Sequence, residues 1–178
     1  MNRISRAVIL IAVFFALLPL ARASDADWRQ LRPLVEAASP LSSSGGMVPL
    51  EGQPVIVTFF ASWCPPCTDE FGHLNTLAAS EEFGDAQIIG INVFEDFGGV
   101  ENPQRMERFL DRTQPQFPLV TGSKEIRAAF GNIDRIPTVV VYGKSGQEVW
   151  RFVHERNATK THATADDLIG ALKQAQTQ

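Results

Sequence analysis

The stretch that decides the fold runs from Val55 to Cys67: Val-Ile-Val-Thr-Phe-Phe-Ala-Ser-Trp-Cys-Pro-Pro-Cys. Residues 55–61 are almost all apolar and mostly β-branched or aromatic, which is typical of a strand buried on both faces. From Cys64 onward the apolar residues follow a helical spacing. The chain has 2 cysteines and both lie here. The sequence therefore predicts a C-x-x-C pair at a strand-to-helix junction.

Such a pair is either a structural disulfide or a redox-active dithiol. A bridge from Cys64 to Cys67 would close a very short loop, for which the entropic stabilisation by a disulfide is near its minimum. We therefore interpret the pair as redox-active. Cys64 would begin the helix, where unpaired N–H groups and the helix dipole stabilise a thiolate. This predicts Cys64 as the nucleophile and Cys67, one turn deeper, as the resolving thiol.

The N-terminus has the layout of a secretory signal peptide. Arg3 and Arg6 precede an apolar run over 7–18, and Ala21-Arg22-Ala23 offers a small-x-small cleavage site. We predict a signal peptide over 1–23, with an uncleaved membrane anchor as the alternative. From Ala7 to Ala21 the apolar segment is about 15 residues long, which is shorter than the roughly 20 that span a bilayer. The expected location is periplasmic or otherwise extracytoplasmic, secreted or membrane-anchored.

Composition favours one acidic globular domain. The chain has 178 residues and a formal net charge of -4. Loss of residues 1–23 would lower the number of basic residues from 16 to 13 against 20 acidic ones, for a net charge of -7. An acidic chain disfavours nucleic acid and anionic membranes as partners. The roughly 155 residues that remain suit one domain with a hydrophobic core, and we expect a monomer.

Periodicity predicts the remaining elements. In chain order they are a helix over 26–38 with a Leu31, Leu34 and Val35 stripe, a loop over 39–53 with room for a short strand, a strand over 54–61, a helix from 64, a strand over 87–93, a helix from Pro103, a strand over 117–120, a helix over 124–130, a hairpin of 138–142 and 148–153, and a last helix opened by a capping box at Thr164. This order predicts an α/β fold, a mixed sheet flanked by helices on both faces. We divide the mature chain into an N-terminal helix and loop extension over 24–53 and a main domain over 54–178.

Ile136-Pro137 lies directly before the strand expected at 138–142. Proline is kept out of strand interiors, but one that opens a strand can follow either a cis or a trans peptide bond. The residues alone leave both possibilities open.

The run over 55–67 resembles the active-site strand and turn of the thioredoxin superfamily. The signal peptide, the W-C-x-x-C-x-x-E pattern and an insert near 94–103 resemble its extracytoplasmic TlpA/ResA/DsbE-like branch, and the likeness extends to about residue 174. It implies a thioredoxin-like fold with a cis Pro137 beside the dithiol. The residues expected to contact a partner protein are Trp63, Pro65, Pro66, Ile136 and Pro137.

Two positions depart from relatives. Cytoplasmic thioredoxins carry a buried aspartate six residues before the first cysteine, where this chain has Thr58. The extracytoplasmic branch instead resembles this chain in having Glu70, which shares a helix face with Cys67. A buried carboxylate there would have a raised pKa and could accept a proton from Cys67, whereas the alternative is a solvated helix residue. The family pattern continues E-x-P, but this chain has Gly72.

Other polar residues carry weaker signals. Glu95 and Asp96 follow a buried strand at the edge where such folds place their active sites, and could influence partner choice. We favour the simpler interpretation of a solvated acidic loop. His73, His154 and His162 show no metal-ligand spacing, so neither a metal site nor a cofactor is expected.

These features predict a thiol–disulfide oxidoreductase that acts on protein thiols and disulfides. The resemblance implies the reducing direction, as in cytochrome c maturation, and a membrane dithiol reductase as electron donor. A copper(I)-binding, metallochaperone-like module is the alternative, since thiolates suit copper(I). A thiol peroxidase ranks last, because relatives of that class carry threonine at the position of Ala61.

Overall fold

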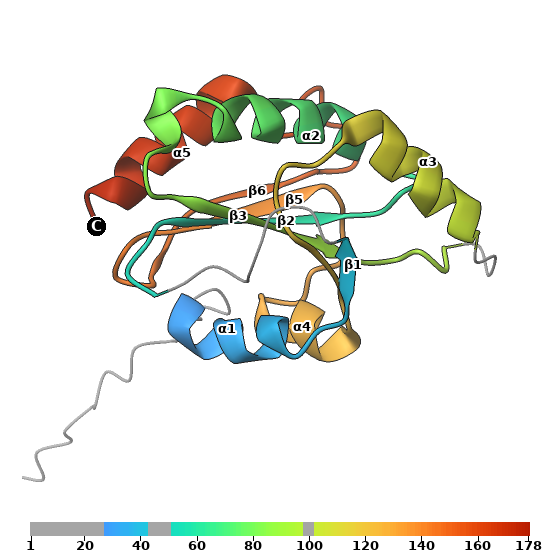
Figure 1. Cartoon of the computed structure of the whole chain (residues 1–178), viewed down its shortest axis with the longest axis horizontal. Coiled ribbons are helices and arrows are strands. Elements are labelled where there is room, and N and C mark those ends of the chain that lie inside the picture. The colour runs from blue at the N-terminus through green and yellow to red at the C-terminus, as the bar shows by residue number, and fades with distance from the viewer. Residues whose placement is uncertain (1–26, 43–50, 98–101) are drawn as a thin grey trace, which may run out of the picture.

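The computed structural model describes residues 27–42, 51–97 and 102–178 (Figure 1). The predicted signal peptide over 1–23 and part of the loop expected over 39–53 lie outside the described residues. Within the described ranges, none of the helices combines the length and the apolar character needed to cross a membrane.

A six-stranded mixed sheet forms the centre of the molecule, in the order β1-β4-β3-β2-β5-β6. Its strands are β1 (Pro40–Ser42), β2 (Val55–Phe60), β3 (Gln87–Asn92), β4 (Leu119–Thr121), β5 (Thr138–Tyr142) and β6 (Glu148–Val153). β2 pairs in parallel with β3 and antiparallel with β5. Every residue of β2 is buried, which accounts for its continuous apolar run.

Helices cover both faces of this sheet, as the sequence predicts. In Figure 1, α2 (Pro65–Ala78), α3 (Pro103–Thr113) and α5 (Ala165–Gln176) lie on one face, and α1 (Trp28–Glu36) and α4 (Lys124–Ala129) on the other. A short 3-10 helix, Glu81–Phe83, follows α2 and was not predicted. Because strand side chains alternate, Ile56 and Phe60 join the core beneath α2 and α5, whereas Val57 and Phe59 join the core against α1 and α4.

Helix α1 buries Leu31 and Val35 as predicted, but not Leu34. Trp28, Leu31 and Val35 are buried in the same core cluster as β2 residues, whereas Leu34 is 40% exposed. At 3.6 residues per turn, positions 28, 31 and 35 line one face and position 34 falls beside it. The prediction for Leu34 was wrong because it omitted Trp28, whose large side chain selects the face that packs. The N-terminal extension thus contributes to the common core.

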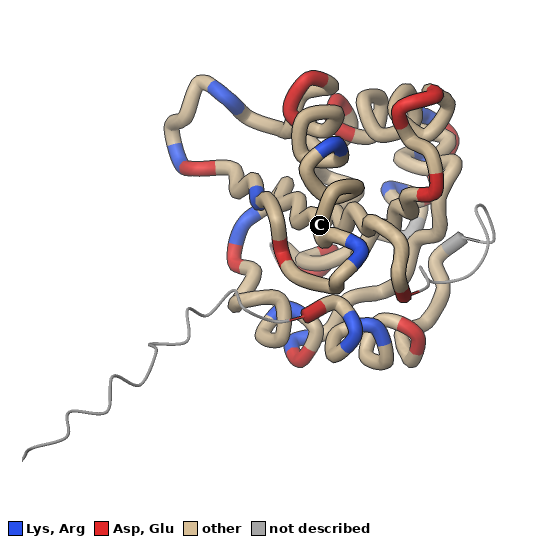
Figure 2. The backbone as a smooth tube through the Cα atoms, turned by 90° about the vertical axis from the view of Figure 1, so that its left-hand side faces the viewer, with Lys and Arg blue, Asp and Glu red and all other residues tan. Residues whose placement is uncertain are grey.

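Other elements lie close to their expected positions. β4 begins two residues later than the predicted strand, at Leu119. The capping box at Thr164 is confirmed: Thr164 Oγ1 accepts from the Asp167 N–H at 3.4 Å, and Asp167 Oδ2 accepts from the Thr164 N–H at 2.8 Å. On the side shown in Figure 2, the described Lys and Arg residues are interspersed with Asp and Glu.

Two glycines give a matched test of this packing. A Cβ at Gly122 would lie 2.7 Å from the Asn92 carbonyl oxygen and 2.6 Å from Val93 Cγ1, whereas one at Gly72, on α2, would meet no atom within 4 Å. We expect Gly122→Ala to lower the free energy of unfolding by about 1–3 kcal/mol. Gly72→Ala should raise it by about 0.5–1 kcal/mol, because alanine favours the helix. Urea unfolding of the oxidised protein measures both, and an unchanged midpoint for Gly122→Ala would contradict the packing described.

Candidate active site

The two cysteines lie where β2 leads into α2. Cys64 and Cys67 form a disulfide with Cα atoms 5.3 Å apart. Cys64 is the N-cap of α2, and its sulfur accepts the Cys67 N–H at 3.3 Å. Cys64 is 4% exposed and Cys67 fully buried. An incoming group therefore reaches the Cys64 sulfur first, at the end of the helix that favours negative charge.

The two prolines of the motif occupy the first helical positions of α2. Proline is tolerated there because the first N–H groups of a helix have no intrahelical acceptor. Pro65 is exposed and Pro66 half-buried. The motif thus begins α2 without breaking it and presents Pro65 beside the Cys64 sulfur.

Glu70 lies on the buried face of α2 and is fully inaccessible to solvent. Its Oε1 accepts the Thr58 hydroxyl at 2.7 Å, and its Oε2 accepts the Ala163 N–H at 3.2 Å. Burial raises the pKa of Glu70 to about 7, and the two hydrogen bonds oppose part of that rise. The solvated alternative for Glu70 is therefore wrong. The absence of the family's proline leaves α2 continuous through Gly72.

The segment after β3 contacts the turn that precedes the disulfide. Glu95 Oε1 accepts the Ser62 N–H at 2.6 Å, and Glu95 Oε2 accepts the Ser62 hydroxyl at 2.7 Å. The Phe94 carbonyl oxygen accepts the Trp63 indole N–H at 2.7 Å. The favoured interpretation of Glu95 as part of a solvated loop is thus wrong. Asp96 is exposed, as that interpretation expects.

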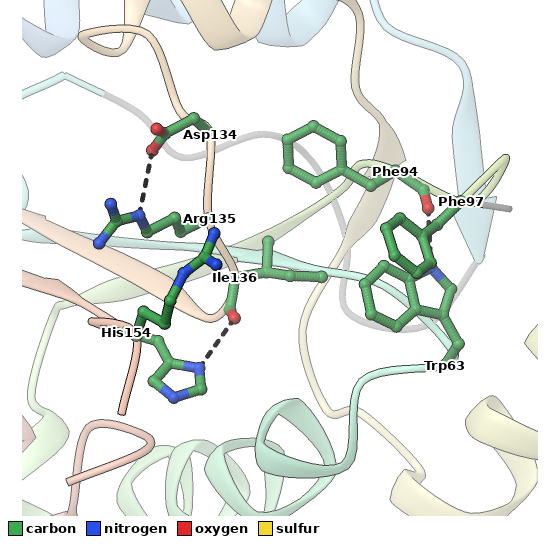
Figure 3. Close-up of a pocket in the computed structure, with 8 residues that line it drawn as sticks. Trp63, Phe94, Phe97, Asp134, Arg135, Ile136 and His154 are labelled. Carbon is green, nitrogen blue, oxygen red and sulfur yellow. Dashed lines mark hydrogen bonds and ion pairs between the residues drawn. The ribbon is translucent and has the colours of Figure 1, made fainter. Parts of the chain in front are cut away.

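A cleft of about 430 Å³ opens beside Trp63 (Figure 3). One wall is aromatic, with the Trp63 and Phe97 rings stacked at 4.7 Å. Ile136 lies between this wall and a polar wall on the opposite side. The residues that line the cleft are Trp63, Phe94, Phe97, Asp134, Arg135, Ile136, His154 and Arg156.

The residues that precede the cis proline, Asp134, Arg135 and Ile136, line this cleft. The Ile136–Pro137 peptide bond is cis, as the resemblance implies. The His154 ring nitrogen Nδ1 lies 3.3 Å from the Ile136 carbonyl oxygen. The backbone N–H of His154 donates to the Pro137 carbonyl oxygen at 3.1 Å. Because Thr138 is the register partner of Phe59, this segment lies at the end of the sheet that leads to Cys64.

A second groove, of about 330 Å³, is also lined by Trp63. It contains Cys64 and Pro65 and is bordered by Asp69 of α2 and Arg112 of α3. Arg112 Nη2 donates to the Thr68 hydroxyl at 3.3 Å. Trp63 therefore contributes to both hollows, and Cys64 lies in the second.

The structure brings two histidines together, which their spacing in the sequence did not predict. The His73 and His162 rings stack with centroids 5.3 Å apart, next to Ala163, whose N–H bonds Glu70. Burial, together with the nearby His73, lowers the pKa of His162. Across the ranges that the structure describes, no group of three or more His, Cys, Asp or Glu side chains is arranged to hold a metal ion.

Known proteins are similar to this chain in sequence and in fold. The Redoxin family model matches residues 43–169. Sporulation thiol-disulfide oxidoreductase A of Bacillus subtilis is 26% identical over 145 residues, which cover 78% of this chain and 85% of that protein. Thiol-disulfide oxidoreductase ResA of Halalkalibacterium halodurans is 30% identical over 102 residues, which cover 56% of this chain and 53% of that one.

The chain is also similar to solved structures of proteins of the same kind. The crystal structure of StoA from Bacillus subtilis matches with a TM-score of 0.54 at 25% identity, over 69% of this chain and 84% of that one. A secreted Mycobacterium tuberculosis disulfide oxidoreductase homologous to Escherichia coli DsbE matches with a TM-score of 0.57 at 25% identity, over 77% and 93%. The chain therefore belongs to the Redoxin family and is a thiol–disulfide oxidoreductase with a thioredoxin-like fold.

Proposed function

We propose that the protein reduces disulfides of partner proteins outside the cytoplasm, with Cys64 as nucleophile, Cys67 as resolving thiol and Glu70 as proton acceptor. The observation that carries this proposal is the arrangement along α2. The Cys64 sulfur, in a residue that is 4% exposed, caps the helix, a fully buried sulfur lies one turn deeper, and a buried carboxyl group lies three residues beyond it. The three groups are thus placed for attack, for resolution and for the proton transfer that precedes resolution.

Reduction of a partner disulfide takes two thiol–disulfide exchange steps. The Cys64 thiolate attacks a partner disulfide, a bond forms between Cys64 and one partner sulfur, and the other partner sulfur leaves as a thiolate. Glu70 then takes the proton of the Cys67 thiol. The Cys67 thiolate attacks the Cys64 sulfur and expels the second partner thiolate. The partner gains two electrons, its two thiolates take up protons, and the protein is left with the Cys64–Cys67 disulfide found here.

Partner binding is assigned to the cleft beside Trp63. Trp63 and Ile136 offer apolar surface, and Pro65 lies at the edge of the groove that holds Cys64. Pro66 stiffens the first turn of α2, and the cis bond at Pro137 shapes the segment against which an extended partner chain would lie. Apocytochromes c are one class of partner consistent with the extracytoplasmic branch of the family.

We place the protein in the periplasm or another extracytoplasmic compartment, exported through residues 1–23 and followed by the extension over 24–53 and the domain over 54–178. One structural relative is described as secreted, which supports this placement. Each turnover leaves a disulfide, so a donor of two electrons must follow. A membrane dithiol reductase supplies them.

Trapping tests the roles of the two sulfurs. Cys67→Ala should accumulate mixed disulfides between Cys64 and partner proteins, because nothing resolves the first adduct. Cys64→Ala is the matched control and should form none. Mass spectrometry of adducts from the extracytoplasmic fraction measures both. The proposed function is wrong if Cys67→Ala forms no adduct and the wild-type dithiol fails to reduce a model protein disulfide.

The pH dependence of resolution tests Glu70. The rate constant for resolving a mixed disulfide should rise as pH increases through about 7, since Glu70 must be ionised to accept the proton. Glu70→Gln should lower the rate constant about 100-fold and remove that rise. Thr58→Val, which deletes a hydrogen bond that lowers the pKa of Glu70, should move the midpoint to higher pH, and Thr58→Ser should restore it. Stopped-flow kinetics on a preformed mixed disulfide measures the rate constant of each variant against pH. The same pH dependence in all variants would contradict the role of Glu70.

The buried Glu70 carboxyl should also affect stability. The free energy of unfolding should fall as pH rises, whereas the rate constant for resolution should rise. Because burial raises the pKa of Glu70 from 4.5 to about 7, the neutral form stabilises the fold. This contribution is complete below pH 4.5 and is lost as pH rises through about 7. Relative to Glu70→Gln, the wild-type free energy of unfolding should fall by about 3 kcal/mol across this window. Urea unfolding of both oxidised proteins gives the difference, and parallel curves would show that Glu70 is not buried as described.

A further inference from the structure

The segment that follows β3 is held in an unusual conformation against the active-site turn. Phe94 has a φ of 60°, in the left-handed region that residues other than glycine rarely adopt. This conformation accompanies two contacts: the Phe94 carbonyl accepts the Trp63 indole N–H, and the next side chain, Glu95, reaches Ser62. A strained backbone persists where surrounding contacts determine it, which suggests that these contacts matter for the site.

Glu95 gathers three donors onto one carboxylate. Its Oε1 accepts the Ser62 N–H at 2.6 Å and the Asn92 side-chain amide at 2.7 Å, and its Oε2 accepts the Ser62 hydroxyl at 2.7 Å. Ser62 and Asn92 are each 5% exposed, so water could not readily replace Glu95 as their partner. Hydrogen bonds to an ionised acceptor are stronger than neutral ones. Glu95 therefore fixes the turn that delivers Cys64 to the start of α2.

The same carboxylate is hydrogen-bonded to the turn that carries the reactive sulfur. Ser62 is two residues before Cys64, so their Cα atoms are at most about 7 Å apart. A negative charge held on this turn raises the energy of a Cys64 thiolate and leaves the disulfide unaffected. It therefore opposes the helix N-terminus, which favours the thiolate.

We propose that Glu95 is a positioning residue of the active-site turn whose negative charge makes the Cys64–Cys67 couple more strongly reducing. The proposal deepens the proposed function and rests on it, because the charge matters only if the couple exchanges electrons. By destabilising the thiolate, Glu95 destabilises the reduced protein relative to the disulfide and favours transfer of electrons to a partner.

Other charged groups near Cys64 are held constant by the test. Asp69 and Arg112 border the groove that contains Cys64, and Glu70 lies beneath Cys67. Across Trp63, the cleft presents further ionisable side chains, Asp134, Arg135, His154 and Arg156. A single substitution at Glu95 leaves all of these in place, so the difference from wild type reports the Glu95 charge.

Glu95→Gln isolates that charge from the geometry. The amide oxygen can still accept from the Ser62 N–H and the Asn92 amide, and the new NH₂ group can donate to the Ser62 hydroxyl oxygen. We expect the pKa of the Cys64 thiol to fall by about 0.5–1 unit. The equilibrium constant for oxidation by dithiothreitol, measured at a pH above that of thiol ionisation, should shift about three- to tenfold toward the dithiol. This corresponds to a potential about 15–30 mV less negative. The shift should vanish at a pH where the thiol is protonated in both proteins.

Asp96→Asn is the matched control, because it removes one negative charge from the neighbouring exposed residue. It should change the equilibrium constant less than about twofold, since solvent and salt screen an exposed charge. Glu95→Ala removes both the charge and the acceptor. It should show the same redox shift as Glu95→Gln together with a lower Tm, and it provides the measurement if the glutamine variant does not fold.

The outcomes separate the two proposals. An unchanged equilibrium constant in a folded Glu95 variant, or an equal shift in Asp96→Asn, would overturn the role of Glu95 while leaving the proposed function intact. A wild-type protein whose cysteines do not exchange with dithiothreitol at all would overturn the proposed function itself.

Discussion

The pairing of β2 on both sides is the constraint on which the rest of this structure depends. β2 runs parallel to β3 and antiparallel to β5, and each of its residues is buried. A shift of one residue would turn its whole side-chain pattern to the wrong face, so its register is strongly specified. The end of β2 therefore delivers the Ser62–Cys64 turn to one place, where α2 begins and where the cis Ile136–Pro137 bond meets it.

Two carboxylates near the disulfide are used differently because their surroundings differ. Glu70 is enclosed beneath α2, where burial raises its pKa into the range useful for proton transfer. Glu95 is only half-buried and is surrounded by three donors at 2.6–2.7 Å, an arrangement suited to a permanent acceptor that holds backbone in place. Environment rather than residue type separates a group that exchanges protons from one that fixes a turn.

The topology explains why segments so distant in sequence meet at this site. β2 and β3 are parallel, so their carboxyl ends lie at the same edge of the sheet, and the chain that leaves each strand passes the other. β5 is antiparallel to β2, so its beginning lies at that edge as well. Ala163, just before α5, approaches from the helical layer and closes the site around Glu70. Four separate parts of the chain thereby surround a motif of two sulfurs.

The sequence by itself determined the features that depend on spacings of a few residues. These are a buried strand followed directly by a helix, two sulfurs on the first turn of that helix, and Glu70 on its inner face. The cis bond at Pro137 required a resemblance as well, because proline before a strand is compatible with both isomers. Only the tertiary structure decided the contacts between residues 12, 33 and 93 positions apart, which join Thr58 to Glu70, Ser62 to Glu95 and Ala163 to Glu70. An acidic loop that is solvated and one that binds a distant turn share the same local pattern, so sheet register and chain crossovers, rather than local propensity, determined what Glu95 does.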